Sequence, residues 1–230
     1  MKKRNKKIYI VIPAFNEGAV IKKTLQSLQN SNYKNIVVVD DGSVDNTARE
    51  VEAVGVEVIT HLINRGQGAA LRTGMEYILE NYSPDIVITF DSDGQHRPQD
   101  IQKLIQPLLN NEADIVLGSR FLKNNSNIPF FRRFILKAGV LFTNFIARIK
   151  LTDTHNGLRA LNSKALQKIK ITHRGMEHAS DIINEITKNN LRYREVPVKI
   201  VYTNYSLAKG QATGNFIKMG LKIILHKLLN

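Results

Sequence analysis

The 230-residue sequence contains no cysteine and no tryptophan, and it has only 6 prolines. Without cysteine, disulfide frameworks, zinc–thiolate sites, iron–sulfur clusters and thiol nucleophiles are excluded. The chain also lacks an uninterrupted apolar stretch of roughly 20 residues, which a membrane-spanning helix needs. The densest candidate, residues 128–149, is broken by four cationic side chains. The apolar content of 43% is too high for a disordered chain, so we expect one globular body.

The N-terminus lacks the pattern of a secretory signal. Five cationic residues lie within residues 1–7, but only the five apolar residues 8–12 follow before Pro13. A signal peptide needs an apolar region of about 7–15 residues. We therefore expect a protein that is made in the cytosol and stays there.

Acidic residues are scarce in the second half of the chain. Residues 1–120 hold 14 Lys and Arg against 15 Asp and Glu, whereas residues 121–230 hold 19 against 5, and the net charge is +13. Such asymmetry indicates a polyanionic partner for the second half. Nucleic acid, anionic lipid headgroups and a phosphorylated substrate would all satisfy the charge.

Short apolar runs alternate with helical patterns in the first half. We predict strands at residues 7–13, 35–40, 56–59, 85–91 and 114–118. We predict helices between them at residues 18–30, 45–53, 67–81 and 98–110. This alternation indicates βαβ units, hence an α/β fold with a mostly parallel sheet flanked by helices. Ligands of such sheets bind beyond the carboxyl ends of the strands.

The second half is less regular. It contains a predicted helix at residues 176–189, an alternating strand at 193–201 and a final helix from residue 215. In that last segment Lys218 and Lys222 share one polar stripe on a helix rich in Ile and Leu. We interpret residues 213–230 as an amphipathic C-terminal helix, which suits a membrane interface or docking onto the body or a partner chain.

Carboxylates follow the fourth predicted strand. The run Asp91-Ser92-Asp93 is followed by Gly94-Gln95-His96. Oxygen ligands favour Mg²⁺ or Mn²⁺ over softer metals, and such an ion would bridge a nucleotide diphosphate and neutralise a departing phosphate. The alternative is two solvated loop aspartates.

Two other strand ends and one glycine-rich loop are also distinctive. The second strand ends in Asp40-Asp41-Gly42-Ser43 and the first in Pro13-Ala14-Phe15-Asn16-Glu17. Helix capping is an alternative for both, and different residues could serve each purpose. Asn64-Arg65-Gly66-Gln67-Gly68 is not a Walker A sequence, because no Lys-Ser or Lys-Thr follows at the required place. We interpret it as a close-packing or donor-lid loop.

In this order the motifs resemble the family 2 glycosyltransferases of the GT-A fold, in particular the dolichyl-phosphate mannosyltransferase-like branch. The likeness covers residues 7–120, where Gly118-Ser119-Arg120 is a further match. It continues more loosely through residues 153–159, 195–198 and 206–211. It implies a Rossmann-like GT-A domain over residues 1–212, with a nucleotide-sugar half at 1–120 and an acceptor half at 121–212.

The resemblance also implies roles for single residues. Asp91, Asp93 and Gln95 would bind Mg²⁺ or Mn²⁺ with the donor diphosphate, and Asp93 and Arg120 would be catalytic. Arg120 would lie near the sugar phosphate or the acceptor phosphate. The remaining donor-site residues would be Pro13, Phe15, Glu17, Val39, Asp41 and Ser92. On the acceptor side, Arg132 or Arg133 would receive a lipid phosphate, and Lys209 would close over the donor.

The implied reaction is a metal-dependent, inverting transfer of a sugar from GDP-mannose or a UDP-hexose to a polyprenyl phosphate. The alternative is transfer to a sugar hydroxyl in polysaccharide or cell-envelope glycan synthesis. A phosphate acceptor is already anionic near neutral pH, whereas a hydroxyl needs a general base. Asp153 and Glu177 are the candidates for that base, and ordinary turn or helix-start chemistry is the alternative for each.

The expected partners follow from this reading. They are the nucleotide-sugar donor, the polyprenyl-phosphate or glycan acceptor, an anionic membrane surface and a small membrane-anchoring protein. We expect no nucleic acid partner, because carboxylates at the strand ends would repel its phosphates. The expected location is cytoplasmic and peripheral, at the inner face of the cell membrane.

Overall fold

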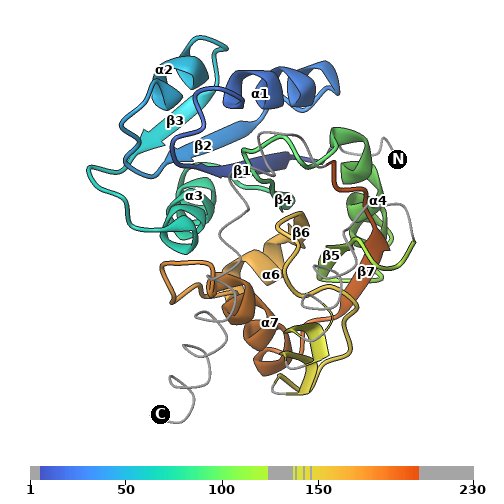
Figure 1. Ribbon diagram of the computed structural model, residues 1–230. Coiled ribbons are helices and arrows are strands. Elements are labelled where there is room, and N and C mark those ends of the chain that lie inside the picture. Colours follow the sequence, from blue (N-terminus) through green and yellow to red (C-terminus); the bar gives the residue numbers. More distant parts are fainter. Residues whose placement is uncertain (1–5, 124–136, 138, 142, 146, 202–230) are drawn as a thin grey trace.

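The computed structural model describes residues 6–123, 137, 139–141, 143–145 and 147–201. They form a seven-stranded mixed sheet in the order β3-β2-β1-β4-β6-β5-β7 (Figure 1). The strands are β1 (Ile8–Ala14), β2 (Ile36–Asp40), β3 (Glu57–Thr60), β4 (Ile86–Thr89), β5 (Ile115–Ser119), β6 (Arg159–Asn162) and β7 (Tyr193–Pro197). The helices are α1 (Ile21–Asn30), α2 (Thr47–Glu52), α3 (Gln67–Asn81), α4 (Pro98–Leu109), α6 (Ser163–Lys168) and α7 (His178–Lys188).

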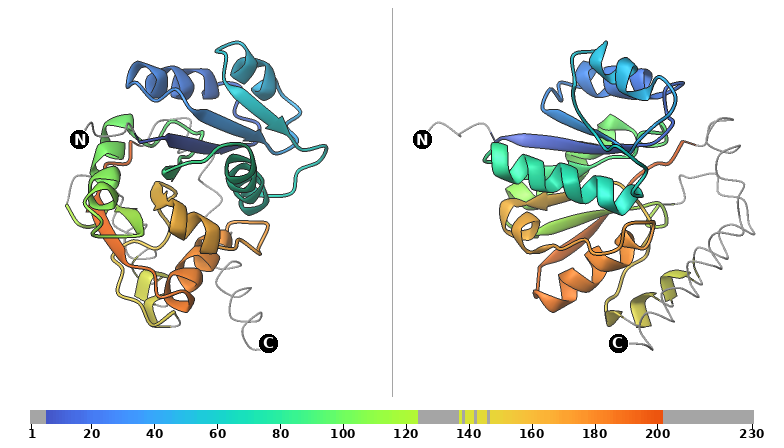
Figure 2. Two further views of the ribbon diagram at one scale, coloured as in Figure 1. Left: turned by 180° about the vertical axis from the view of Figure 1, so that it is seen from behind. Right: turned by 90° about the vertical axis from the view of Figure 1, so that its left-hand side faces the viewer.

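Helices cover both faces of the sheet, which confirms the predicted α/β architecture (Figure 2). Alternate residues of a strand point to opposite faces. In β1, Ile10 and Ile12 therefore belong to the core beneath α1, α2 and α4, whereas Val11 belongs to the core beneath α3, α6 and α7. The central parallel strands β1, β2 and β4 are largely apolar on both faces, as buried parallel strands are.

The direction of the strands departs from a purely parallel pattern at one place. Strand β6 runs antiparallel between β4 and β5, and both halves of the chain thus contribute to a single sheet. The sequence did not predict β6 or α6. The strand predicted over residues 193–201 ends at Pro197, and the helix predicted from residue 176 begins at His178.

The strand order creates a switch point between β1 and β4. The chain proceeds outward from β1 through the parallel strands β2 and β3, and then returns to place β4 on the other side of β1. Open α/β sheets bind ligands at such a point, beyond the carboxyl ends of the strands. Phe15, Asp41 and Asp91 all follow these strand ends.

Several predictions fall outside the described residues. They are the acceptor-side residues Arg132 and Arg133, the donor-closing Lys209 and the amphipathic helix at 213–230. Within the described part of the chain, no helix is both long enough and apolar enough to cross a bilayer.

Candidate active site

An open cleft of about 740 Å³ lies at the carboxyl ends of β1, β2 and β4. All but one of the predicted donor-site and metal-site residues of the first 100 positions line it: Pro13, Phe15, Glu17, Asp41, Asp91, Ser92, Asp93 and Gln95. The exception is Val39, whose side chain is fully buried in β2 against Gly74 of α3. A side-chain contact between Val39 and a nucleoside is therefore not supported, because α3 covers that face of the strand.

The buried carboxylate of Asp41 fixes the glycine-rich loop at one edge of the cleft. Its carboxylate accepts hydrogen bonds from the backbone N–H groups of Arg65 at 3.0 Å and Gly66 at 2.6 Å. Its Oδ1 also lies 2.7 Å from His61 Nδ1, and the other ring nitrogen of His61 lies 3.0 Å from Thr73 Oγ1. A buried carboxylate with several donors is well stabilised. Asp41 thereby fixes the glycine-rich loop beside the first turn of α3.

The neighbouring Asp40 closes the turn after β2. Its Oδ1 accepts from the backbone N–H of Ser43 at 3.1 Å, and the Ser43 hydroxyl contacts the same oxygen. The Ser43 hydroxyl in turn accepts from the Asn16 N–H at 2.9 Å, which ties the loops after β1 and β2 together. Asp40 thus holds the turn while Asp41 lines the cleft, and the residue before α2, Asn46, makes no side-chain capping hydrogen bond.

Asp91 is held from two sides. Its Oδ1 accepts from the Gln67 side chain at 3.2 Å, and its Oδ2 lies 2.8 Å from His96 Nε2. A Cβ at Gly157 would come within 2.3 Å of the same carboxylate, so only glycine allows this approach. Burial opposes ionisation of Asp91, but the positive charge available on His96 and that of Arg159 hold its pKa below the usual range.

Asp93 is in the opposite electrostatic situation. Burial, followed by the charges of Asp91 and Glu17, raises the pKa of Asp93 to about 6. Its Oδ1 accepts from the backbone N–H of Gln95 at 3.0 Å. Carboxylates that raise one another's pKa are crowded in the absence of a counter-charge.

This crowding suits a divalent cation. Mg²⁺ in proteins is usually bound through one or two carboxylates together with substrate phosphates. Among the described residues no group of three His, Asp or Glu side chains is close enough to hold an ion alone. Asp91, Asp93 and the Gln95 amide therefore fit an ion that takes its other ligands from a diphosphate.

A smaller pocket of about 160 Å³ adjoins the cleft, and Asp91, Gln67, Gln95 and Met176 line both. Its other lining side chains are largely cationic or polar: His96, Arg120, His155, Asn156, Arg159 and His178. Burial lowers the pKa of His155 and of His178 to about 4, so both imidazoles are neutral at pH 7. Among the described residues that line this pocket, only Asp91 contributes a carboxylate.

Arg120 is clamped by Asp153. Its Nε and Nη2 donate to the two carboxylate oxygens at 2.6 and 2.9 Å, and its backbone N–H donates at 3.1 Å. Burial opposes ionisation of Asp153, but the Arg120 charge keeps its pKa below the usual value. Asp153 lines neither pocket, and its role as a base stays a prediction; the geometry favours a role in positioning Arg120.

The other candidate base, Glu177, lines neither pocket, although its neighbours Met176 and His178 line the smaller one. Its carboxylate folds back toward the preceding Gly175, where an added Cβ would lie 2.5 Å from Oε2. Glu177 is the residue just before α7.

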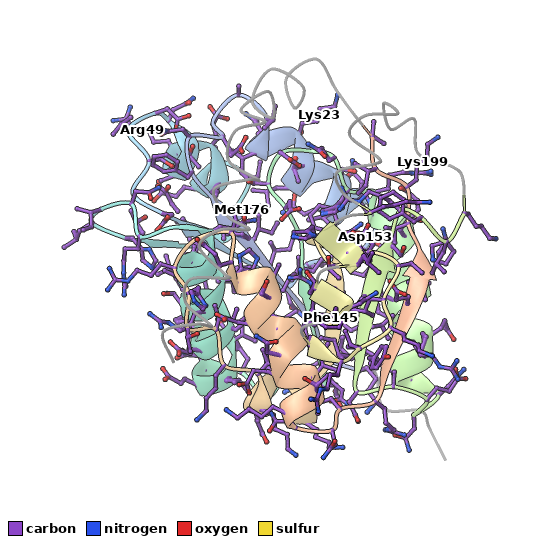
Figure 3. All side chains as sticks on the ribbon, turned by 60° about the horizontal axis from the view of Figure 1, so that its bottom comes forward. Lys23, Arg49, Phe145, Asp153, Met176 and Lys199 are labelled. Carbon is purple, nitrogen blue, oxygen red and sulfur yellow. The ribbon has the colours of Figure 1, made fainter. Side chains whose placement is uncertain are left out.

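The segment before α7 forms a wall that the sequence did not predict. Arg174 accepts a hydrogen bond from Ala69 N–H at 3.1 Å, and a Cβ at Gly66 would lie 2.4 Å from the Arg174 carbonyl oxygen. Met176, labelled in Figure 3, stands on this segment and lines both pockets. The paired glycines at 66 and 68 were the available signal, and their interpretation as a close-packing loop agrees with the structure.

Comparison with known proteins assigns the family. Residues 9–170 match the family model described as glycosyl transferase family 2. A UDP-N-acetylglucosamine–dolichyl-phosphate N-acetylglucosaminyltransferase of Methanococcus voltae is 37% identical, over 98% of this chain and 96% of the relative. An undecaprenyl-phosphate mannosyltransferase of Micrococcus luteus is 28% identical, over 94% of both chains.

A solved structure matches the fold. Glucosyl-3-phosphoglycerate synthase from Mycobacterium tuberculosis, in complex with Mn²⁺ and uridine-diphosphate-glucose, superposes with a TM-score of 0.72. The match covers 96% of this chain and 77% of that one at 21% identity, and it agrees with the expected GT-A architecture. Because the family model matches more than half of the chain, this chain belongs to glycosyl transferase family 2 and is a glycosyltransferase.

Proposed function

We propose that this enzyme transfers a sugar from a nucleotide sugar, GDP-mannose or a UDP-hexose, to the phosphate of a polyprenyl phosphate. Two similar enzymes act on dolichyl phosphate and undecaprenyl phosphate by name. The observation that carries the proposal is the smaller pocket beside Asp91. It contains the guanidinium groups of Arg120 and Arg159, and Asp91 is the single carboxylate among the described residues that line it.

The larger cleft fits the donor. Its position at the switch point between β1 and β4 suits a nucleotide. Phe15 is about 39% exposed and offers an aromatic edge or face there, while Glu17 and Asp41 offer acceptors. These contacts would hold the nucleoside, and Asp91, Asp93 and Gln95 would meet the diphosphate.

A bound Mg²⁺ or Mn²⁺ would neutralise negative charge on the diphosphate leaving group. Asp91 and Asp93 would hold that ion, with His96 and Gln67 fixing the orientation of Asp91. Arg120, rigidly held by Asp153, would supply a fixed positive charge on the acceptor side. Inversion follows if the acceptor oxygen displaces the leaving group directly.

The acceptor argument rests on which bases are available. A hydroxyl nucleophile needs a general base within hydrogen-bond reach. Asp153 is paired with Arg120, Glu177 lines neither pocket, and both oxygens of Asp91 already accept hydrogen bonds. His96, whose Nδ1 is buried without a partner among the described residues, is the remaining candidate base for a hydroxyl. A phosphate oxygen needs no base, because it is already anionic. The two guanidinium groups of the pocket, Arg120 and Arg159, support a phosphate acceptor over a sugar hydroxyl.

We also propose that the enzyme works at the cytosolic surface of the membrane. A polyprenyl phosphate is a membrane lipid with an anionic headgroup, and the second half of the chain carries 19 cationic against 5 acidic residues. Each basic residue near an anionic surface adds about 1 kcal/mol of attraction. A small membrane-anchoring partner protein is consistent with the same picture.

A donor screen tests the proposal. The purified chain is incubated with GDP-mannose, UDP-glucose or UDP-N-acetylglucosamine, Mg²⁺ or Mn²⁺, and a short polyprenyl phosphate, and released nucleotide diphosphate is measured. We expect acceptor-dependent release with at least one donor, and none with the matching polyprenol. Release that depends equally on the polyprenol would contradict the proposal.

A further inference from the structure

A buried guanidinium in the smaller pocket has an unsatisfied donor. Arg159 is the first residue of β6, in the middle of the sheet, and only 2% of it is exposed. Its Nη1 is buried and has no hydrogen-bond partner among the described residues. Burial lowers the pKa of Arg159 to about 10, so it remains charged at pH 7. A buried cation with an unmade hydrogen bond is costly to the folded state.

The nearby carboxylates do not satisfy this donor. Asp91 and Asp153 both act on the Arg159 charge electrostatically. Their hydrogen bonds nevertheless go elsewhere: Asp91 accepts from Gln67 and faces His96, and Asp153 is clamped to Arg120.

A second buried donor lines the same pocket. Asn156 is 4% exposed, and its Oδ1 accepts from the Leu158 N–H at 2.9 Å. That bond fixes the amide orientation, because only the oxygen accepts. The Asn156 Nδ2 is then left buried without a hydrogen-bond partner in the described part of the chain. Two unsatisfied donors, one of them cationic, thus line one small pocket.

Resting on the function proposed above, we propose that Arg159 and Asn156 bind the phosphate of the acceptor and so select a phosphate monoester over an alcohol. The pocket volume of about 160 Å³ is several times the ~30 Å³ share of a liquid water molecule. It is smaller than the ~300–1,000 Å³ of pockets that enclose whole ligands. An anion with several acceptor oxygens would satisfy both donors at once.

The donor diphosphate is the other source of phosphate at this place, because Asp91 lines both pockets. We assign the smaller pocket to the acceptor phosphate. The donor diphosphate is expected at Asp93 and Gln95, and Asp93 lines only the larger cleft. Separate measurements for the two ligands distinguish the sources.

The test uses three variants of the full chain. Asn156→Asp keeps the oxygen that accepts from Leu158 but replaces the unsatisfied donor by a carboxylate oxygen. Arg159→Gln removes the cation. Arg194→Gln, at an exposed position of β7, is the charge-matched control. Calorimetric titration with geranyl phosphate, geraniol, and UDP with Mn²⁺ gives the dissociation constants, and circular dichroism checks that each variant is folded.

We expect Asn156→Asp and Arg159→Gln to weaken geranyl phosphate binding at least tenfold. Binding of UDP with Mn²⁺ should stay within about twofold, and Arg194→Gln should leave both unchanged. Unchanged geranyl phosphate affinity in the near-isosteric Asn156→Asp variant would overturn the proposal, even if Arg159→Gln failed to fold. A loss confined to UDP would also overturn it, because the cation would then serve the leaving group.

The wild-type protein separates this inference from the proposed function. If it binds UDP or GDP with Mn²⁺ but binds geranyl phosphate no better than geraniol, the phosphate subsite is wrong and the glycosyltransferase donor site stands. If it binds neither nucleotide, the proposed donor chemistry itself fails.

Discussion

At the scale of single residues, most carboxylates of the site are already held by hydrogen bonds or ion pairs in the ligand-free protein. Asp41 accepts a hydrogen bond from the glycine-rich loop, and Asp153 pairs with Arg120. Asp91 contacts His96 and accepts a hydrogen bond from Gln67. Asp93 is the exception, since its neighbours are the like charges of Asp91 and Glu17. Charges held in fixed positions can stabilise a leaving group without reorganising.

Asp93→Asn should therefore stabilise the ligand-free protein while destroying activity. Removing one of the crowded carboxylates relieves repulsion worth about 1–2 kcal/mol at pH 7. The same change removes a cation ligand, and we expect turnover to fall about 10²-fold or more. Urea unfolding without metal and a transfer assay with Mn²⁺ measure the two effects.

Glu52→Gln, at an exposed position of α2, is the control and should change neither quantity. A destabilised Asp93→Asn protein with full activity would argue against a cation at this position.

Asp153 and Glu177 should respond differently to loss of charge. Asp153→Asn breaks the bidentate grip on Arg120 and should raise the acceptor KM and lower turnover by about 10–100-fold, as misplaced groups do. Glu177→Gln should stay within about threefold of the wild type, because Glu177 lines neither pocket. Steady-state kinetics with varied acceptor measure both. A collapse of turnover in Glu177→Gln alone would identify it as a base.

At the scale of elements, loops after the strands are locked to one another across the cleft. The segment before α7 rests on the start of α3, and Asp181 of α7 anchors it by accepting from the backbone N–H groups of Thr172 and His173, both at 2.7 Å. The wall of the site is thus built by residues about 100 positions apart in the chain.

Gly66→Ala should weaken this contact much more than Gly55→Ala. Both glycines have positive φ, and alanine is strained by about 1 kcal/mol in the left-handed region of Gly55. Gly66, at φ 96° and ψ 155°, lies in a region that is essentially restricted to glycine, so the strain is larger there. At Gly66 the new Cβ would also collide with the Arg174 carbonyl, whereas nothing lies within 4 Å at Gly55. We expect losses of about 3 and about 1 kcal/mol in the free energy of unfolding, measured with urea. Equal losses would mean that the segment before α7 is free to move aside.

The carboxylate of Asp114, just before β5, makes the stability of the fold depend on pH in the acid range. Asp114 precedes β5 and accepts from the Arg192 side chain at 3.0 Å, the Arg192 backbone N–H at 3.0 Å and Asn162 at 3.2 Å. These bonds, the Arg192 side chain first, hold the pKa of Asp114 below its usual value. Since the folded pKa is lowered, the stabilisation is present at neutral pH and is lost as pH falls below about 4.

Asp114→Asn should accordingly lose about 2 kcal/mol of stability at pH 7, because hydrogen bonds to a charged group are removed. Its stability should fall less steeply than that of the wild type between pH 4 and pH 2. Thermal unfolding at stepped pH compares the two slopes. Parallel curves would show that this carboxylate does not carry the acid sensitivity.

The elements that sequence could predict are those with a long periodic signal. The strand-end carboxylates were visible because β1, β2 and β4 are apolar runs with a clear boundary. Strand β6 was missed because Arg159–Asn162 has four residues, a charged start and no alternation, and its place depends on β4 and β5. For α6 a signal existed, since Asn162 caps it by accepting from the Ala165 N–H at 2.8 Å.

The site was predictable only where a motif lay on one strand end. Arg159 belongs to the segment 153–159, which resembles the family only loosely. The residues around it in the sequence do not indicate that its guanidinium is buried in the pocket. Asp153 and Arg120 are 33 positions apart in the sequence, and a local sequence pattern cannot predict a contact between residues so far apart.

At the scale of the whole molecule, one sheet carries two kinds of chemistry. The nearly neutral first half supplies most of the acidic donor cleft, and the smaller pocket beside it combines Arg120 of the first half with Arg159 of the basic second half. The antiparallel β6 between β4 and β5 brings the two together, because Arg159 starts this strand next to the end of β4. Sugar donor and phosphate acceptor would thus meet at Asp91.

The most direct test of this account is the bond that the enzyme makes. Phosphorus NMR of the reaction between a short polyprenyl phosphate and the active nucleotide sugar follows the acceptor phosphorus. We predict that its phosphate monoester signal is replaced by a phosphodiester signal, in step with release of nucleotide diphosphate. An acceptor that becomes glycosylated while its phosphorus remains a monoester would contradict the account.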